Sequence, residues 1–292
     1  MEDDWNGGYM YLEKKIKHNF TLLVEKDDLK QRLAKGNASQ QFAFMPDKTT
    51  QIVAGNDACI EDFPFIAEIQ RHEKRRDPWE HWCGAVILSE TWLLTAAACF
   101  EGRIKNMRVR CGFEDLSDPK KQIRTIRRFT IHPRYNMDEN VQFDNNIAVI
   151  KLRTPLKFGP RCQNISYTTI RGSDGLKNCQ VSGWGFVDAN RTEADTLQFA
   201  DISVLSNTKC NDLAYPTVPK TQICAYDCKN IQQACNGDAG GPFTCEINGN
   251  RVLVGVFAWL YNVCNAEKPF VYSAVAYYTS FIEKWTGIKG IP

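Results

Sequence analysis

The stretch that decides the fold reads Ala234-Cys235-Asn236-Gly237-Asp238-Ala239-Gly240-Gly241-Pro242. Two shorter segments upstream of it carry related information. One reads Thr95-Ala96-Ala97-Ala98-Cys99, and the other reads Asn145-Asn146-Ile147-Ala148-Val149-Ile150-Lys151-Leu152. An alanine methyl group can neither attack a carbonyl carbon nor accept a proton. Ala98 and Ala239 therefore bring no reactive group to these segments.

These three segments resemble the GDSGGP, TAAHC and NDIALIKL motifs of chymotrypsin-like serine proteases. By this resemblance Ala239 stands for the nucleophilic serine, Ala98 for the general-base histidine and Asn146 for the orienting aspartate. The family's chemistry needs all three roles, and their loss costs on the order of a millionfold in turnover. The resemblance therefore implies a chain that keeps the fold without the catalysis. The chain has four histidines, His18, His72, His81 and His132, and none of them lies in a motif that predicts a substitute base.

Further segments follow in the family's order. His81-Trp82-Cys83-Gly84-Ala85-Val86-Ile87-Leu88 resembles the strand before the histidine loop, Cys179-Gln180-Val181-Ser182-Gly183-Trp184-Gly185 matches C-x-x-SGWG, and Lys268-Pro269-Phe270-Val271-Tyr272 resembles KPGVY. The resemblance covers residues 52–288. It implies an all-β fold of two six-stranded antiparallel β-barrels with a C-terminal α-helix.

The apolar pattern of the chain agrees with this fold. Short runs at 65–69, 85–88, 147–152 and 252–257 alternate with Gly, Asn, Asp and Pro, which is typical of short strands in barrels or sandwiches. Residues 277–288 change period, because Tyr278, Phe281, Ile282 and Trp285 fall on one helical face. This segment is predicted to be a helix that packs on the barrels.

Residues 1–51 are expected to form a separate charged leader or pro-region, poorly ordered or helical. They carry eight Lys or Arg residues against eight Asp or Glu residues and no cysteine. The segment Ile52-Val53-Ala54-Gly55 resembles the IVGG start that activation cleavage frees in the family, and Asp238 is the residue that the new amine would meet. Gln51 precedes it where tryptic activators require Arg or Lys. Asp238 is therefore interpreted as structural, and cleavage before Ile52 stays open.

The 12 cysteines lie between Cys59 and Cys264, which favours disulfides and an oxidising compartment over zinc, because paired C-x-x-C knuckles are absent. The family resemblance implies the pairs Cys83–Cys99, Cys179–Cys245, Cys210–Cys224 and Cys235–Cys264. Cys59, Cys111, Cys162 and Cys228 remain, and they allow two further bridges in three ways. Sequons at Asn19, Asn37, Asn164 and Asn190 also favour secretion. No signal peptide is visible after Met1, so we expect an incomplete or misassigned N terminus of an extracellular protein.

The substrate groove also departs from the family's pattern. Ala258-Trp259-Leu260 stands for Ser-Trp-Gly, and Phe270 stands for the glycine of KPGVY. Glycine leaves room for a substrate side chain, so Leu260 and Phe270 are expected to block the specificity pocket. Gln233 stands at the pocket floor, where trypsin-like enzymes carry an aspartate. Gly237 and Ala239 are expected to form only a relic of the oxyanion hole.

Two basic runs define a possible exosite for an acidic protein segment or a sulfated glycan. They comprise Arg71, Lys74, Arg75, Arg76, Lys120, Lys121, Arg124, Arg127 and Arg128. An ordinary solvated surface is the alternative interpretation, because acidic residues lie close to both runs.

The net charge of +2 and the absence of a long apolar run give no case for nucleic-acid or membrane binding. We expect a monomer without cofactor or metal that binds an extracellular protein, as a decoy, cofactor or regulator in a proteolytic cascade such as clotting, complement or melanisation. Inactive homologues of this kind are frequent in arthropods. An active peptidase with an unorthodox nucleophile and a structural or storage protein are the alternatives.

Overall fold

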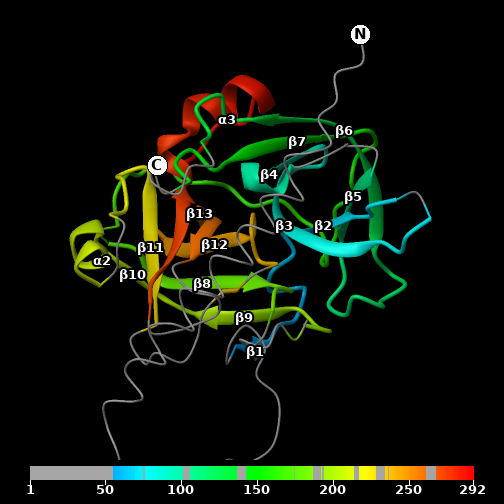
Figure 1. The fold of residues 1–292 in the computed structure, drawn as a ribbon, viewed down its shortest axis with the longest axis horizontal. Helices are drawn as coiled ribbons and strands as arrows, with labels where there is room; N and C mark the ends of the chain where they lie inside the picture. The colour runs from blue at the N-terminus through cyan, green and yellow to red at the C-terminus, as the bar shows by residue number, and fades with distance from the viewer. Residues whose placement is uncertain are drawn as a thin grey trace, which may run out of the picture. The chain divides into compact units, whose positions relative to one another are not determined.

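The computed structural model describes residues 55–292 apart from 75, 101–105, 137–142, 174, 187–191, 193, 214–216, 228–233, 236 and 261–267. Its strands form two antiparallel sheets (Figure 1). The first is a closed barrel in the order β2-β3-β4-β7-β6-β5. Its strands are β2 (Ile66–Arg71), β3 (Glu80–Ser89), β4 (Trp92–Thr95), β5 (Met107–Cys111), β6 (Gln122–Ile131) and β7 (Ala148–Leu152).

The second sheet has the order β1-β9-β8-β12-β13-β14-β11-β10. Its strands are β1 (Asn56–Asp57), β8 (Lys177–Gly183), β9 (Gln198–Asp201), β10 (Ser203–Leu205), β11 (Gln222–Tyr226), β12 (Pro242–Ile247), β13 (Asn250–Leu260) and β14 (Phe270–Ala274). The sheet curls, because β10 at one end of it lies against β8, which is the third strand from the other end. The expected all-β fold is confirmed, and so is the first six-stranded barrel, whereas the second sheet has eight strands and curls into a half-barrel without closing.

The strands that read as unbroken apolar runs are buried on both faces. On β3, Ala85 and Ile87 point into the core of the closed barrel, whereas Val86 and Leu88 point into a second core. This second core also receives Leu253 and Val256 from β13, so it joins the two sheets. Side chains alternate between the faces of a strand. Continuous hydrophobicity therefore marks strands that lie between two cores.

The C-terminal helix α3 (Thr279–Thr286) follows a 3-10 turn at Val275–Tyr277. Phe281 and Ile282 are buried in the core between the sheets, and Tyr278 and Trp285 pack on the same core. Gly287 ends the helix at a φ of +75°, a backbone conformation that favours glycine. The predicted helix is thus confirmed, although it is shorter than 277–288.

A second helix, α2 (Asn207–Leu213), was not predicted from the sequence. Within the described residues, no helix is both long enough and apolar enough to cross a membrane. The predicted leader, residues 1–51, lies outside the residues that the structure describes.

Candidate functional site

The loop before β12 places Ala239 between the two barrels. The Asp238 amide donates to the Cys235 carbonyl at 3.1 Å, and the Gly84 amide of β3 donates to the Ala239 carbonyl at 2.8 Å. Gly237 and Gly240 have φ values of +98° and +81°, which ordinary side chains rarely adopt. The half-buried Ala239 packs on the apolar cores of both sheets. The loop therefore holds a methyl group where the resemblance assigns the nucleophile.

Ala98 and Asn146 meet on the first barrel. The Ala98 amide donates to Oδ1 of Asn146 at 2.9 Å, and Nδ2 of Asn146 donates to the carbonyl of Ala258 at 3.0 Å. Asn146 is 1% exposed, and its own carbonyl accepts the hydroxyl of Ser273 at 2.8 Å. Its side chain thus acts as an acceptor on one side and as a donor on the other. A carboxylate has no proton to donate to Ala258, so this environment fits an amide.

The carboxyl of Asp238 is buried beneath the loop. Oδ1 accepts the amide of Gly185 at 2.9 Å, and Oδ2 accepts the amide of Cys235 at 2.8 Å. Burial raises its pKa to about 6, while the two amides and the charge of His81 act in the opposite direction. No salt bridge to Asp238 occurs within the described part of the chain.

His81 lies against the same loop. Its Nε2 is 2.8 Å from the Gly237 carbonyl, and its Nδ1 is 3.1 Å from Oε1 of Glu68 on β2. Both neighbours are acceptors, so the imidazolium form satisfies both contacts. Burial lowers the pKa of His81, but the hydrogen bond and charge of Glu68 outweigh it and the net pKa is raised.

Glu68 is held as a carboxylate in turn. Burial alone would raise its pKa, but His81 and the guanidinium of Arg110, whose Nε donates to Oε2, lower it overall. The sequence analysis missed this His81–Glu68–Arg110 network. The only sign of this network in the sequence was a histidine directly before Trp82-Cys83. Glu68 and Arg110 lie on other strands, and no motif predicts how those strands pair.

The residues assigned to the specificity pocket lie on β13 and β14. Leu260 and Phe270 are directly opposite each other in the pairing of these strands. Phe270 is 1% exposed in the core of the second sheet, and Leu260 packs on the same core. Trp259 donates from Nε1 to Oε1 of Gln222 at 3.1 Å. A phenyl ring therefore fills space that glycine would leave open; Gln233 lies outside the described residues.

A sequence profile of the family described as Trypsin matches residues 52–282. This chain belongs to the trypsin family. It is 34% identical to Trypsin-3 of Salmo salar over 248 residues, which cover 82% of this chain and 94% of that protein. It is 31% identical to "Fibrinolytic enzyme, isozyme C" of Lumbricus rubellus, over 79% of this chain and 98% of the other. Chymotrypsin-like elastase family member 1 of Bos taurus is 29% identical over 85% of this chain and 92% of its own length.

The disulfides of this trypsin-family domain include three of the implied pairs, Cys83–Cys99, Cys179–Cys245 and Cys210–Cys224. Cys235 is also disulfide-bonded, but Cys264 lies outside the described residues. A further bridge joins Cys111 of β5 to Cys162. Cys59 is an exposed free thiol whose Sγ donates to Oε2 of Glu61 at 2.9 Å. The bridge between Cys111 and Cys162 belongs to one of the three pairings that the sequence left open, and Cys228, the other cysteine of that pairing, lies outside the described residues.

The first basic run of the trypsin-family domain starts at the last residue of β2, the second continues into β6, and both strands pair with β5. Arg71 of β2 places its guanidinium 3.3 Å from the ring centroid of Trp82. Lys121 donates from Nζ to the Leu116 carbonyl at 3.1 Å, and Arg124 donates from Nε to the Pro155 carbonyl at 2.8 Å. Arg127 and Arg128 of β6 are exposed. Lys74, Arg76 and Lys120 are exposed as well, whereas Arg75 lies outside the described residues.

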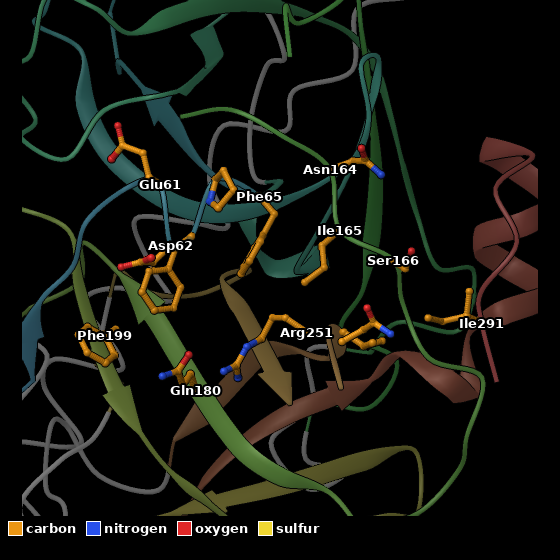
Figure 2. A pocket seen from close by; sticks show the side chains of 14 residues that line it. Glu61, Asp62, Phe65, Asn164, Ile165, Ser166, Gln180, Phe199, Arg251 and Ile291 are labelled. Atoms are coloured by element: carbon orange, nitrogen blue, oxygen red, sulfur yellow. The ribbon is translucent and has the colours of Figure 1, made fainter. Parts of the chain in front are cut away.

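A separate cavity of about 720 Å³ lies beside β8, β9 and β13 of the second sheet and is also lined by residues 61–65 and 164–166 (Figure 2). Phe65, Ile165 and Phe199 line it together with Arg251, and none of Ala98, Asn146 and Ala239 does. Asn164 also lines it, and both Asn164 and Ser166 of this sequon are exposed. The sequons at Asn19, Asn37 and Asn190 lie outside the described residues.

Proposed function

We propose that this chain is a non-catalytic member of the trypsin family that acts outside the cell by binding other proteins. In this proposal it serves as a decoy, cofactor or regulator in a proteolytic or immune cascade, as the inactive arthropod homologues that it resembles do. The disulfide bonds and the likeness to trypsins support an extracellular site of action.

The hydrogen bonding of Asn146 carries the proposal. Its amide uses both polar ends, accepting from Ala98 and donating to Ala258. Ala98, Asn146 and Ala239 thus carry no charge, and the polar atoms of the Asn146 side chain are hydrogen-bonded. None of the three side chains can take up or release a proton as catalysis requires. After a single chance substitution, the other two triad positions would still suit catalysis. Here all three are replaced, and the hydrogen-bond partners of Asn146 suit an amide.

The substrate pocket supports the same conclusion independently. Phe270 is buried opposite Leu260, at positions where the family's motifs place glycine. A substrate side chain entering there would have to displace a phenyl ring from the core. Displacing a buried phenylalanine costs on the order of 3 kcal/mol. Binding of a peptide in the productive orientation is therefore disfavoured before any chemical step.

The alternative function is peptidase activity, because the relatives carry the names of trypsins and a fibrinolytic enzyme. Incubation of the native protein with a fluorophosphonate probe, followed by intact-mass analysis, separates the two. We expect no adduct, both for the full chain and for protein cleaved before Ile52. An adduct that depends on the native fold, or turnover of a casein substrate above a heat-denatured control, would establish the peptidase instead.

Binding is tested by its effect on a protease cascade. The protein is added to plasma or haemolymph in which a clotting or melanisation protease is activated, and the rate of product formation is followed. We expect a saturable change in this rate and a stoichiometric complex, neither of which chymotrypsinogen produces at equal concentration. The same rate with both proteins would leave a structural or storage role.

A further inference from the structure

Four cations gather where β6, β7 and α3 meet on the first barrel, as Figure 1 shows for the three elements. Arg128 of β6 and Lys151 of β7 are directly opposite each other in the strand pairing. The pairing shifts register between Ile126 and Arg128, and both Arg127 and Arg128 are exposed at this bulge. Like charges directly opposite on neighbouring strands destabilise a sheet by a few tenths to about 1 kcal/mol. The fold keeps this unfavourable pair.

Two tryptophans hold the cations in place. Nζ of Lys151 lies 4.6 Å from the ring centroid of Trp92, and the guanidinium of Arg128 lies 5.5 Å from the same centroid. The Arg128 guanidinium is also 5.5 Å from the ring of Trp285 on α3, and Lys284 is 5.8 Å from that ring. Such cation–π contacts hold charged groups in fixed directions. Arg128, Lys151 and Lys284 thus lie over two tryptophan rings, and the exposed Arg127, next to Arg128 at the bulge, completes a cationic platform of four residues.

No acid neutralises this platform in the part of the chain that the structure describes. None of the salt bridges found there involves any of its four cations. Glu283 of α3 precedes Lys284, and it takes part in none of these salt bridges. Partial burial and then the positive charges of Arg127 and Arg128 lower the pKa of Lys151.

The platform offers neither a free strand edge nor a side-chain pocket to which a peptide could bind. β6 is paired on one side with β5 and on the other with β7, so no free strand edge is left for an added strand. Trp92 is 8% exposed and offers no pocket for an anchoring side chain. Arginine forks bind phosphate through two parallel hydrogen bonds, and a sulfate group offers oxygens in the same tetrahedral geometry. A densely charged sulfated polymer, which binds through fixed cations alone, therefore suits this platform better than an acidic peptide does.

We propose that the platform of Arg127, Arg128, Lys151 and Lys284 binds a sulfated polysaccharide. This site is distinct from the positions of the proposed non-catalytic centre, and it does not depend on the absence of catalysis. It localises the protein on a sulfated surface while leaving the rest of the molecule free for a protein partner.

The test measures binding of the full chain to immobilised heparin across a series of salt concentrations. The variant Arg127→Gln/Arg128→Gln removes two exposed cations. The matched control, Lys177→Gln/Lys209→Gln, removes the same charge from exposed positions of the second sheet and of α2. We expect the first variant to lose about tenfold or more in affinity and to show a shallower salt dependence, and the control to lose less than about threefold. Lys284→Gln alone is expected to weaken binding in the same direction.

Three results would overturn the proposal. The first is an equal loss in both double variants, which would mean nonspecific attraction by net charge. The second is no binding of the unaltered chain to heparin at low salt. The third is equal affinity for heparin, N- and O-desulfated heparin and polyglutamate, which would show that sulfate is not recognised. Unchanged thermal midpoints of the variants establish that the substitutions leave the fold intact.

Discussion

Asn146 sits at the centre of the candidate site, and its hydrogen bonds distinguish an amide from an acid. We predict that Asn146→Asp lowers the free energy of unfolding by about 1–3 kcal/mol at neutral pH, because a buried carboxylate would face the Ala258 carbonyl without a proton between them. The loss should shrink in acid, where the carboxyl is protonated and can donate again. Urea unfolding at several pH values measures it.

The control for this prediction is Asn56→Asp, an exposed position of β1 with no side-chain hydrogen bond found in the described residues. It should change the unfolding free energy by less than about 0.5 kcal/mol at either pH. If Asn146→Asp were as harmless as the control, the amide would not be what this environment selects.

Asp238 supplies a second prediction at the residue scale. Its folded pKa of about 6 lies above the ordinary value of 3.8, so the folded state holds its proton more tightly than the unfolded state does. Its contribution to stability is therefore fully present below about pH 4 and is lost as the pH rises through about 6. Two pKa units correspond to about 3 kcal/mol as an upper bound.

The variant Asp238→Asn removes this titration. Relative to the unaltered chain, its unfolding free energy should rise between pH 4 and pH 7, whatever constant offset the lost amide contact introduces. Urea unfolding at intervals of half a pH unit measures the difference. A difference that stays flat over this range would mean that the carboxyl has found a cation.

At the scale of elements, the bridge between Cys111 and Cys162 ties β5 to the segment that precedes Asn164. It spans 51 residues, so its removal releases a long loop in the unfolded chain. We predict that Cys111→Ala/Cys162→Ala lowers the unfolding free energy by about 2–4 kcal/mol. Cys59→Ser should be nearly neutral, because this thiol is exposed and unpaired. Differential scanning calorimetry compares the variants, and equal midpoints for both would refute the prediction.

At the scale of the whole molecule, catalysis needs groups from both barrels and an open pocket between them. We predict that Ala98→His/Asn146→Asp/Ala239→Ser restores little activity, because Phe270 still occupies the pocket. Adding Leu260→Gly and Phe270→Gly should raise kcat/KM on peptide substrates further. The triple variant should remain at least about a hundredfold below trypsin. Trypsin-like rates in the triple variant would show that the pocket is open.

A glycan at Asn164 is a further expectation for the whole molecule. Asn164 and Ser166 of this sequon are both exposed, and Asn164 lines the cavity of Figure 2, so a glycan attached there would extend into solvent. We predict that protein from a secreting eukaryotic host shifts in mass after treatment with a peptide N-glycosidase. The shift should be smaller by one glycan in Asn164→Gln, and an unchanged shift would exclude this site.

Local patterns in the sequence were sufficient for much of this protein. The motif strings around Ala98, Asn146 and Ala239 predicted the family and the positions of the site, because each string is read within one segment. Strands such as β3 and β13 were found from their apolar runs, since burial on both faces leaves a mark in the order of residues. The pairs Cys83–Cys99, Cys179–Cys245 and Cys210–Cys224 followed from the same resemblance.

Tertiary structure decided what depends on two distant segments at once. The Asn146 side chain meets the Ala258 carbonyl 112 positions away, and Arg128 faces Lys151 across a strand pair whose register contains a bulge. The bond between Cys111 and Cys162 was one of three possibilities until β5 was placed. Hydrogen bonds, ion pairs and disulfides form over a few ångströms, and only the folded backbone brings such partners within that distance.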